Sequence, residues 1–413
     1  MKKEIEVFME EQNLDAIWIS GASQNNPAMV YFTGIHHISA ADLFIRRGQE
    51  PILFYHNMER EEAAKTGLQT ASIDERYAFR KYMQSAQGDM LKASALLYQE
   101  MLTDLDIHEK TIAIAGRREV SVVYAILNAL QELLPKVRFV GQFSGSVINR
   151  ARLTKTPDEV EHIRRMGQIT TSVVGRVAEM LSNSPVRHNI LMAADEKPLT
   201  IGTVKSHIRK WLAEAGADSP EETIFAIGRD AGVPHSAGTE TDVLELGKTI
   251  VFDIFPCEAG GGYFYDFTRT WCLGYAPDEV QRIYQEVFAV HQEVIDSVKL
   301  NTPFYASQAL TCRMFREMGH ATIEDDQNLL EGYVHSVGHG LGLDVHESPF
   351  SGIGSAAMDI LRAGVVFTVE PGLYYPSKGF GVRIEDTVYL NEQGKTEILA
   401  EYPYELVLPM KAG

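Results

Sequence analysis

The chain has 413 residues, of which 45% are hydrophobic and 23% charged, so we expect a globular protein too long for one compact core. Its 38 basic and 56 acidic residues give a formal net charge of −18, which disfavours nucleic-acid and anionic-lipid partners. No apolar run reaches the length that spans a bilayer, so the sequence also argues against a membrane protein.

The N-terminal stretch MKKEIEVFMEEQNLDAIWISG is predicted to be an amphipathic, charged helix that leads into a strand. It lacks the uninterrupted apolar segment of a signal peptide. The three cysteines, Cys257, Cys272 and Cys312, form no CxxC pair, which is typical of a reducing compartment and disfavours a cysteine zinc site. We therefore expect a cytoplasmic protein.

The first third of the chain alternates apolar strand-like runs with amphipathic helical patterns such as SVVYAILNALQELLP. The predicted strands are LDAIWIS (14–20), PILFYH (51–56), TIAIAG (111–116) and VRFVG (137–141). This alternation predicts a small three-layer α/β domain with a mostly parallel sheet. We assign it to residues 1–153.

A strong helix start follows this first domain. Thr156 is predicted as the N-cap, Pro157 as the first helical residue, and Glu159 completes a capping box. Helices are expected over 156–182 and about 202–216. We therefore assign a second domain to residues 154–413.

The second domain is rich in predicted strands, interrupted by a helical segment over 277–320. The strand-like runs are TIVFDIFP (249–256), GYFYDFTRTWCLG (262–274), VVFTVEPGLYY (365–375) and FGVRIEDTVYLN (380–391). The turn PCEAGGG joins the first two as a hairpin. This pattern predicts an α+β domain with an antiparallel sheet and outer helices.

Four carboxylates lie inside these apolar strands: Asp253, Asp266, Glu370 and Glu385. Any one of them alone is most simply interpreted as a core acid bonded to the backbone or to an arginine. Four such groups in one domain would repel one another unless cations lie among them. Oxygen ligands with one imidazole suit a pair of divalent ions such as Mn²⁺, Co²⁺ or Zn²⁺.

A histidine-rich segment, EGYVHSVGHGLGLDVH, can supply that imidazole. His339 is surrounded by glycines, which would let the backbone approach a crowded cluster closely. His335 and His346 flank it and could reach a substrate instead of the metals. For each histidine alone, a core or surface residue with a backbone partner remains the alternative.

In this order, and embedded in DxTRT, GHGxGLxxHE, VEPG and RIED, these residues resemble the ligand set of the pita-bread metallopeptidases. That group includes methionine aminopeptidase, Xaa-Pro aminopeptidase, prolidase and creatinase. The resemblance covers about 156–405, and the first third is similar to the N-terminal domain of creatinase and prolidase. It implies a creatinase-like α/β domain followed by a pita-bread metallopeptidase domain.

The resemblance also implies a role for each site residue. Asp266 and Glu385 would bridge two metal ions, Asp253 would complete the shell of one ion, and His339 with Glu370 that of the other. Glu370 would accept the proton of the attacking water. Four further residues are implied near the substrate or the ligands: His346 and His235 as oxyanion stabilisers, His335 along the pocket, and Arg383 as an anchor of the ligand cluster.

Two departures from the family pattern bear on function. Asp253 and Asp266 are thirteen positions apart, a longer interval than the family usually shows, so we expect a reshaped loop beside the site. The segment 348–361 contains no arginine or lysine, whereas prolidases use an arginine there to hold the carboxylate of a dipeptide.

We therefore expect hydrolysis of Xaa-Pro bonds at the N-terminus of short peptides, with two divalent ions, most simply Mn²⁺. The alternatives are an Xaa-Pro dipeptidase, a metal-dependent lyase or amidohydrolase of a small non-peptide substrate, and a non-catalytic peptide-binding module. Relatives with the extra N-terminal domain commonly form dimers, so the resemblance also implies a homodimer.

Overall fold

The computed structural model describes residues 4–352, 354 and 359–410. Backbone contacts divide them into two compact units. The first ends at Arg152 and also takes in Gly260–Gly262, and the second comprises the remainder from Leu153 onward. Within the described residues, no helix is both long and apolar enough to cross a membrane.

The first unit is built on a mixed sheet with the strand order β4-β3-β2-β1-β5-β6. Its strands are β1 (Ala16–Gly21), β2 (Ala41–Arg46), β3 (Ile52–Tyr55), β4 (Gln69–Ser72), β5 (Thr111–Arg117) and β6 (Arg138–Val140). The pairs β1–β5, β3–β4 and β5–β6 are parallel, which confirms the expectation of a mostly parallel sheet. The exception is β2, which runs antiparallel to both β1 and β3; neither β2 nor β4 was predicted from the sequence. The short link from β2 to β3 can close a hairpin but is too short for a parallel crossover.

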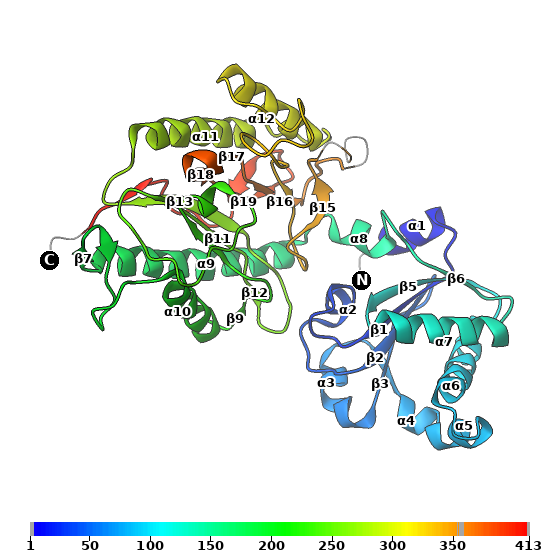
Figure 1. Cartoon of the computed structure of the whole chain (residues 1–413). Helices are drawn as coiled ribbons and strands as arrows, with labels where there is room; N and C mark the ends of the chain where they lie inside the picture. Colours follow the sequence, from blue (N-terminus) through cyan, green and yellow to red (C-terminus); the bar gives the residue numbers. More distant parts are fainter. Residues whose placement is uncertain (1–3, 353, 355–358, 411–413) are drawn as a thin grey trace. The chain divides into compact units, whose positions relative to one another are not determined.

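Helices cover both faces of this sheet, which confirms the three-layer expectation (Figure 1). They are α1 (Glu4–Glu11), α2 (Pro27–Thr33), α3 (Arg60–Lys65), α4 (Ile73–Arg76), α5 (Phe79–Ser85), α6 (Met90–Asp104), α7 (Val120–Leu133) and α8 (Val147–Arg152). Successive residues of β1 alternate between the two cores: Trp18 packs with α6 and α7, whereas Ile17 and Ile19 pack with α1 and α2.

The second unit has two pairs of long helices. They are α9 (Pro157–Asn183) and α10 (Ile201–Glu214), then α11 (Asp278–Ser297) and α12 (Tyr305–Glu317). The predicted capping box of α9 is present, because Thr156 Oγ1 accepts from the Glu159 amide while the Glu159 carboxylate accepts from the Thr156 amide. The predicted helical segment 277–320 corresponds to α11 and α12.

Strands fill the layer between these helix pairs. They are β7 (Val186–Arg187), β8 (Ile190–Leu191), β9 (Ala217–Asp218), β10 (Ile224–Ile227), β11 (Thr249–Ile254), β12 (Cys257–Glu258), β13 (Phe267–Leu273), β14 (His339–Gly340), β15 (Glu347–Phe350), β16 (Val366–Val369), β17 (Gly372–Tyr375), β18 (Phe380–Arg383), β19 (Asp386–Leu390), β20 (Thr396–Ile398) and β21 (Val407–Leu408). The main sheets have the orders β10-β11-β13-β21 and β15-β14-β16-β19-β20, and only the β13–β21 pair within them is parallel, over the described residues.

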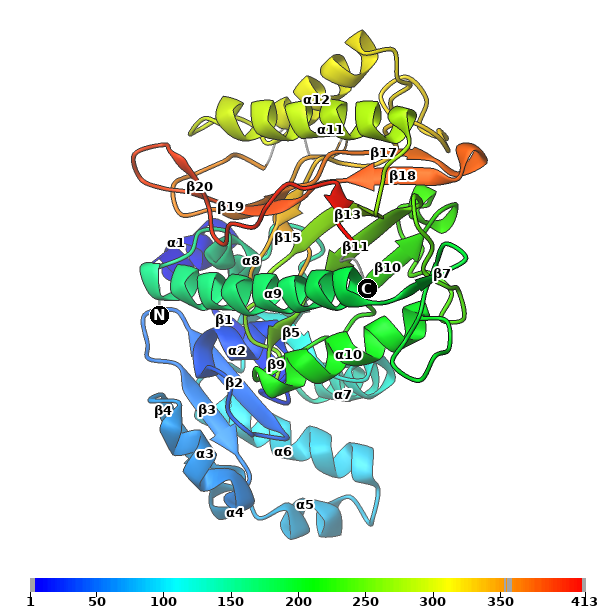
Figure 2. The same cartoon turned by 90° about the vertical axis from the view of Figure 1, so that its left-hand side faces the viewer.

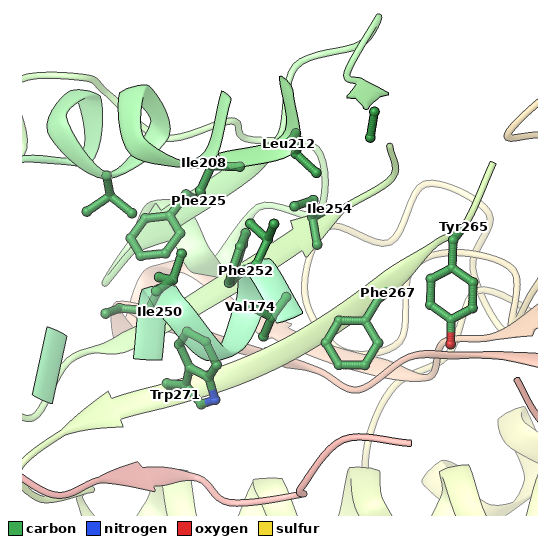
Figure 3. Close-up of a cluster of buried hydrophobic side chains, with 14 of the residues drawn as sticks. Val174, Ile208, Leu212, Phe225, Ile250, Phe252, Ile254, Tyr265, Phe267 and Trp271 are labelled. Carbon is green, nitrogen blue, oxygen red and sulfur yellow. The ribbon is translucent and has the colours of Figure 1, made fainter. Parts of the chain in front are cut away.

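Two large hydrophobic cores and a small third cluster hold the layers of the second unit together in the described part of the chain. Figure 2 shows α9 and α10 on one side of the strands and α11 and α12 on the other. In the first core, Phe225, Phe252 and Trp271 from three neighbouring strands pack edge to face beneath α9 and α10 (Figure 3). The Phe252 and Trp271 ring centroids are 5.6 Å apart, within the range of favourable aromatic pairs.

The long runs predicted as single strands are interrupted next to the carboxylates. The run 365–375 divides at Glu370 and Pro371 into β16 and β17, and the run 380–391 divides at Ile384 and Glu385 into β18 and β19. Proline cannot donate to a sheet ladder, so a break at Pro371 follows from its chemistry. As a result, two of the predicted ligands stand at strand ends, where a side chain can leave the regular face of a sheet.

Candidate metal centre

The two aspartates come from one antiparallel hairpin. Asp253 lies within β11 and pairs with Thr268 of β13, while Asp266 stands just before β13 begins. This pairing brings both carboxylates to the same region of the hairpin despite the thirteen-residue interval. The longer turn therefore leaves the predicted pair in register.

The imidazole of His339 lies on β14, a very short strand between β15 and β16. A Cβ on Gly338 would lie 2.0 Å from the Thr368 carbonyl oxygen, and one on Gly340 would lie 2.1 Å from that of Ser348. Neither position can hold a side chain without moving backbone, so the glycines around His339 serve the close approach that the sequence suggested.

Three of the predicted ligands converge on one point. Ligand atoms of Asp266, His339 and Glu385 all lie within 4.8 Å of one another, and all three residues are buried. The Glu370 carboxylate borders the same point, since its Oε1 lies 3.4 Å from Nε2 of His339, and Asp266 Oδ2 lies 3.6 Å from the same nitrogen.

The carboxylates carry unsatisfied oxygens toward this point. Asp253 Oδ1, Asp266 Oδ1 and Glu385 Oε1 are buried without a hydrogen-bond partner among the described residues. Burial, followed by the neighbouring carboxylates, raises the pKa of both Asp266 and Glu385 well above the ordinary range. Buried acids that repel one another and that each keep one oxygen without a donor fit a cation site, so this residue set fits divalent metal ions.

His339 is prepared to act as a neutral ligand. Its Nδ1 donates to the Gly340 carbonyl oxygen at 3.0 Å, which leaves the lone pair of Nε2 directed at the acids. Burial and the nearby His346 lower the pKa of His339 to about 3, so the ring is uncharged at neutral pH. An imidazole in this tautomer can bind a metal without first losing a proton.

Asp253 is held by a buried arginine, as the resemblance implied. Arg383 Nη2 donates to Asp253 Oδ2 at 2.6 Å, its Nε donates to Thr268 Oγ1 at 3.2 Å, and its Nη1 donates to the Tyr374 hydroxyl at 2.8 Å. Sequence reasoning missed Tyr374, whose strand-like surroundings give no chemical signal. Only the pairing of β17 with β18 brings its hydroxyl next to Arg383.

The remaining predicted histidines differ in their surroundings. His346 is exposed, with its ring centroid 4.4 Å from that of His339. His235 is also exposed, in the loop after the short 3₁₀ turn Asp230–Gly232. Burial, followed by the charge of Arg383, lowers the pKa of His335 to about 3. His335 is engaged on both ring nitrogens, by the Tyr374 hydroxyl at 2.8 Å and the Ser336 carbonyl oxygen at 2.7 Å.

A second buried network lies behind Glu385 and also escaped sequence reasoning. Arg269 donates to the Glu385 carbonyl oxygen at 2.9 Å and to Asp386 Oδ1 at 2.9 Å. The other Asp386 oxygen accepts from Tyr404 at 2.6 Å and faces His291 Nε2 at 3.2 Å. Arg269 was visible in the sequence as part of DxTRT, but its partner could not be identified before the strands were paired.

Comparison with known proteins relates both units to described families. The profile of metallopeptidase family M24 matches residues 161–392, and that of the creatinase/prolidase N-terminal domain matches residues 2–154. An uncharacterized peptidase of Bacillus subtilis, YqhT, is 30% identical over 264 residues, which is 64% of this chain and 70% of the relative.

Two relatives of defined activity are similar over nearly the whole length. The Xaa-Pro dipeptidase of Pyrococcus furiosus is 26% identical over 396 residues, 94% of each chain. The X-Pro aminopeptidase of Thermotoga maritima has a solved structure that matches with a TM-score of 0.74 and 25% identity, over 95% of this chain and 97% of that one.

Proposed function

The chain belongs to metallopeptidase family M24, and from that premise we propose that it hydrolyses Xaa-Pro bonds at the N-terminus of short peptides. The observation that carries this proposal is the convergence of Asp266, His339 and Glu385 within 4.8 Å of one another, with buried acid oxygens that have no donor in the described part of the chain. Such a set is suited to divalent ions and to hydrolysis rather than to passive packing.

Asp253, Asp266, His339, Glu370 and Glu385 would hold two divalent ions. Bound there, the ions would lower the pKa of a water molecule and so supply the nucleophile. Burial raises the pKa of Glu370 to about 8 in the metal-free protein, although the nearby Arg383 opposes this shift. We assign to Glu370 the uptake of the proton of the attacking water and its delivery to the leaving amine.

Two exposed histidines would act on the substrate. His346 stacks edge-on against the ligand His339, so a peptide carbonyl placed at the ligand cluster would lie beside its ring. We assign His346 and His235 the stabilisation of the developing oxyanion. His335 is assigned a supporting role, because its contact with Tyr374 connects it to Arg383 and thence to Asp253.

Proline specificity is supported by the two relatives of defined activity, which act on Xaa-Pro substrates according to their names. The absence of arginine and lysine from 348–361 favours an aminopeptidase over a dipeptidase, because a dipeptide presents a free carboxylate that needs a cation. Dipeptidase activity remains the second candidate, because the chain is similar to the Xaa-Pro dipeptidase of Pyrococcus furiosus.

Four finer points belong to the same proposal. We assign Mn²⁺ as the working ion, with Co²⁺ and Zn²⁺ as alternatives, because this oxygen-rich ligand set suits all three. We also propose a homodimer, a cytoplasmic location, and domains of 1–153 and 154–413. The division of backbone contacts after Arg152 supports the last of these.

A peptide panel tests the proposal. The metal-stripped full chain is reconstituted separately with Mn²⁺, Co²⁺ and Zn²⁺ and assayed on Ala-Pro-Ala, Ala-Pro and Ala-Ala-Ala. We expect release of alanine from Ala-Pro-Ala, less from Ala-Pro, none from Ala-Ala-Ala, and loss of activity with chelator. The exposed Glu392→Gln variant serves as a control that keeps full activity. Chelator-insensitive turnover, or no cleavage of either proline peptide by the metal-loaded protein, would overturn it.

A further inference from the structure

The N-terminal unit contains a cavity of its own, unconnected with the metal ligands in sequence. It has a volume of about 200 Å³ and lies where β1 and β5 end and α7 begins. Its walls are mainly apolar, formed by Ile114, Val123, Ile126 and Leu127 together with the Trp18 ring. Crevices at the carboxyl ends of parallel strands are frequent ligand sites in α/β domains.

Polar groups gather at one end of this cavity. Ser20 and Arg118 belong to its lining. Arg118 Nη1 donates to Ser20 Oγ at 3.1 Å and to the Tyr98 hydroxyl at 3.3 Å. Its Nε and Nη2 donate to no protein group among the described residues, so the guanidinium keeps free donors at the lining of the cavity.

The acid behind this end is already satisfied. Buried Asp42 accepts from Trp18 Nε1 at 2.7 Å, from Ser20 Oγ at 2.5 Å and from the Tyr98 hydroxyl at 3.0 Å. It forms no direct ion pair with Arg118, which it reaches only through Ser20 and Tyr98. Asp42 itself is not among the residues that line the cavity, so the lining offers a cation and apolar walls but no carboxylate that could pair with a ligand ammonium group.

The helix end contributes no second anion site. The carboxylate of Glu119 caps α7 by accepting from the Val122 amide at 2.9 Å, so this N-terminus is already occupied by a negative group. Selectivity for an anion must therefore come from Arg118. The adjoining Val120 is 78% exposed and also lines the cavity, which leaves apolar surface for a ligand to cover.

We propose that this cavity binds a small monocarboxylate with a compact branched apolar body. The carboxylate would pair with the free donors of Arg118, and the hydrocarbon part would lie between Trp18 and α7. The volume of about 200 Å³ limits the body to a few carbon atoms beyond the carboxylate. Because no acidic side chain lines the cavity, an amino acid with the same side chain would bury its ammonium group without a charged partner, so the simple acid is favoured.

The test uses 4-methylpentanoate as the probe, with the full chain and saturation-transfer NMR. We expect saturable binding that is about tenfold or more tighter than that of the uncharged 4-methylpentanamide, because hydrogen bonds to a charged group carry that much discrimination. Acetate, which has the charge but no body, should bind far more weakly than 4-methylpentanoate.

Two variants locate the site. Arg118→Met should remove the preference for carboxylate over amide, whereas Arg138→Met, at an exposed arginine on the edge of the same sheet, should leave it unchanged. Ala115→Leu should fill the cavity and abolish binding of both probes; it keeps the test decisive if Arg118→Met fails to fold. Absence of saturable wild-type binding, or unchanged binding in both site variants, would overturn the proposal. A different outcome would also overturn it: no probe binds, and Val120→Asp changes the mass of the oligomer in solution. The exposed apolar surface around the cavity would then be part of an interface between protein chains.

Discussion

Neutralising one ligand should have opposite effects on the metal-free and metal-bound protein. In Glu385→Gln the side chain keeps its shape and can still accept from Thr268 Oγ1, which lies 2.7 Å from Glu385 Oε2. Two unit charges 4.8 Å apart, the span of the cluster, repel by about 3 kcal/mol at an effective dielectric constant of 20. In the metal-free wild type, either the ionised Glu385 is repelled by neighbouring carboxylates such as Asp266, or one of these acids keeps a proton. The uncharged glutamine side chain of the variant avoids this repulsion.

The sign of the pH dependence follows from the raised pKa values of Asp266, Glu370 and Glu385. A carboxyl whose pKa is higher in the folded than in the unfolded state contributes its full stability below the unfolded value, and this contribution is lost as pH rises toward the folded value. The metal-free wild type should therefore lose stability between about pH 5 and pH 8, with 8 being the pKa to which Glu370 is raised. Glu385→Gln should lose less.

The assay is thermal unfolding of chelator-treated protein at pH 5 and pH 9, repeated with Mn²⁺. At pH 9 the metal-free variant should exceed the wild type by up to about 3 kcal/mol, or about 5 °C in the Tm of the second domain. Mn²⁺ at about one hundred times its Kd should stabilise the wild type by about 2.7 kcal/mol and the variant hardly at all. Glu392→Gln, exposed in the turn after β19, controls for the change in net charge. A folded metal-free variant that is less stable than the wild type at pH 9 would refute the reasoning.

Three further predictions concern the surroundings of the cluster. His346→Ala should keep the wild-type metal content, measured by elemental analysis, while kcat on Ala-Pro-Ala falls by about 10² or more; unchanged turnover would remove His346 from the mechanism. Lys155→Met should lower the free energy of unfolding by about 3–5 kcal/mol in urea titrations and Lys155→Arg by much less, because Lys155 Nζ pairs with the nearly buried Glu347 carboxylate at 2.6 Å. Mn²⁺ binding at pH 7 should release protons, seen in calorimetry as a dependence of the apparent enthalpy on the buffer, since Asp266 and Glu385 have raised pKa values without metal; buffer-independent heats would contradict this.

Much of the architecture follows from local patterns that a sequence displays directly. The capping box at Thr156 marks the start of α9, and the alternation from Thr249 to Ile254 marks β11, because each signal depends on residues close in the chain. Strands β2 and β4 were not predicted, and the antiparallel direction of β2 within a mostly parallel sheet could not be anticipated. Strand direction depends on which neighbours pair, and that information is not local.

The ligands of the site could be predicted from the sequence, but the side chains that surround them could not. Chemical type and motif suffice to single out acids such as Asp266 and Glu385, since a carboxylate within an apolar strand conflicts with its surroundings. The side chains that hydrogen-bond to the network around those acids do not stand out in the sequence, because they suit their apolar surroundings. Tyr374 and Tyr404 look like ordinary strand or loop aromatics, yet their hydroxyls contact Arg383 and Asp386 across pairings that only the fold brings about.

The predicted strands 365–375 and 380–391 are each divided in two, and each break lies at a predicted metal ligand. A strand directs successive side chains to opposite faces, so neighbouring strands offer only every second residue to a common point. At Glu370 and at Glu385 the strand ends, and each carboxylate is freed from that alternation to meet His339 and Asp266. The interruptions that divide the predicted strands are therefore also what lets the acids next to the ends of β13, β16 and β19 converge. Restoring a continuous strand, for instance by Pro371→Val, should strengthen local β pairing while lowering metal affinity, because Glu370 would be drawn back into the regular ladder.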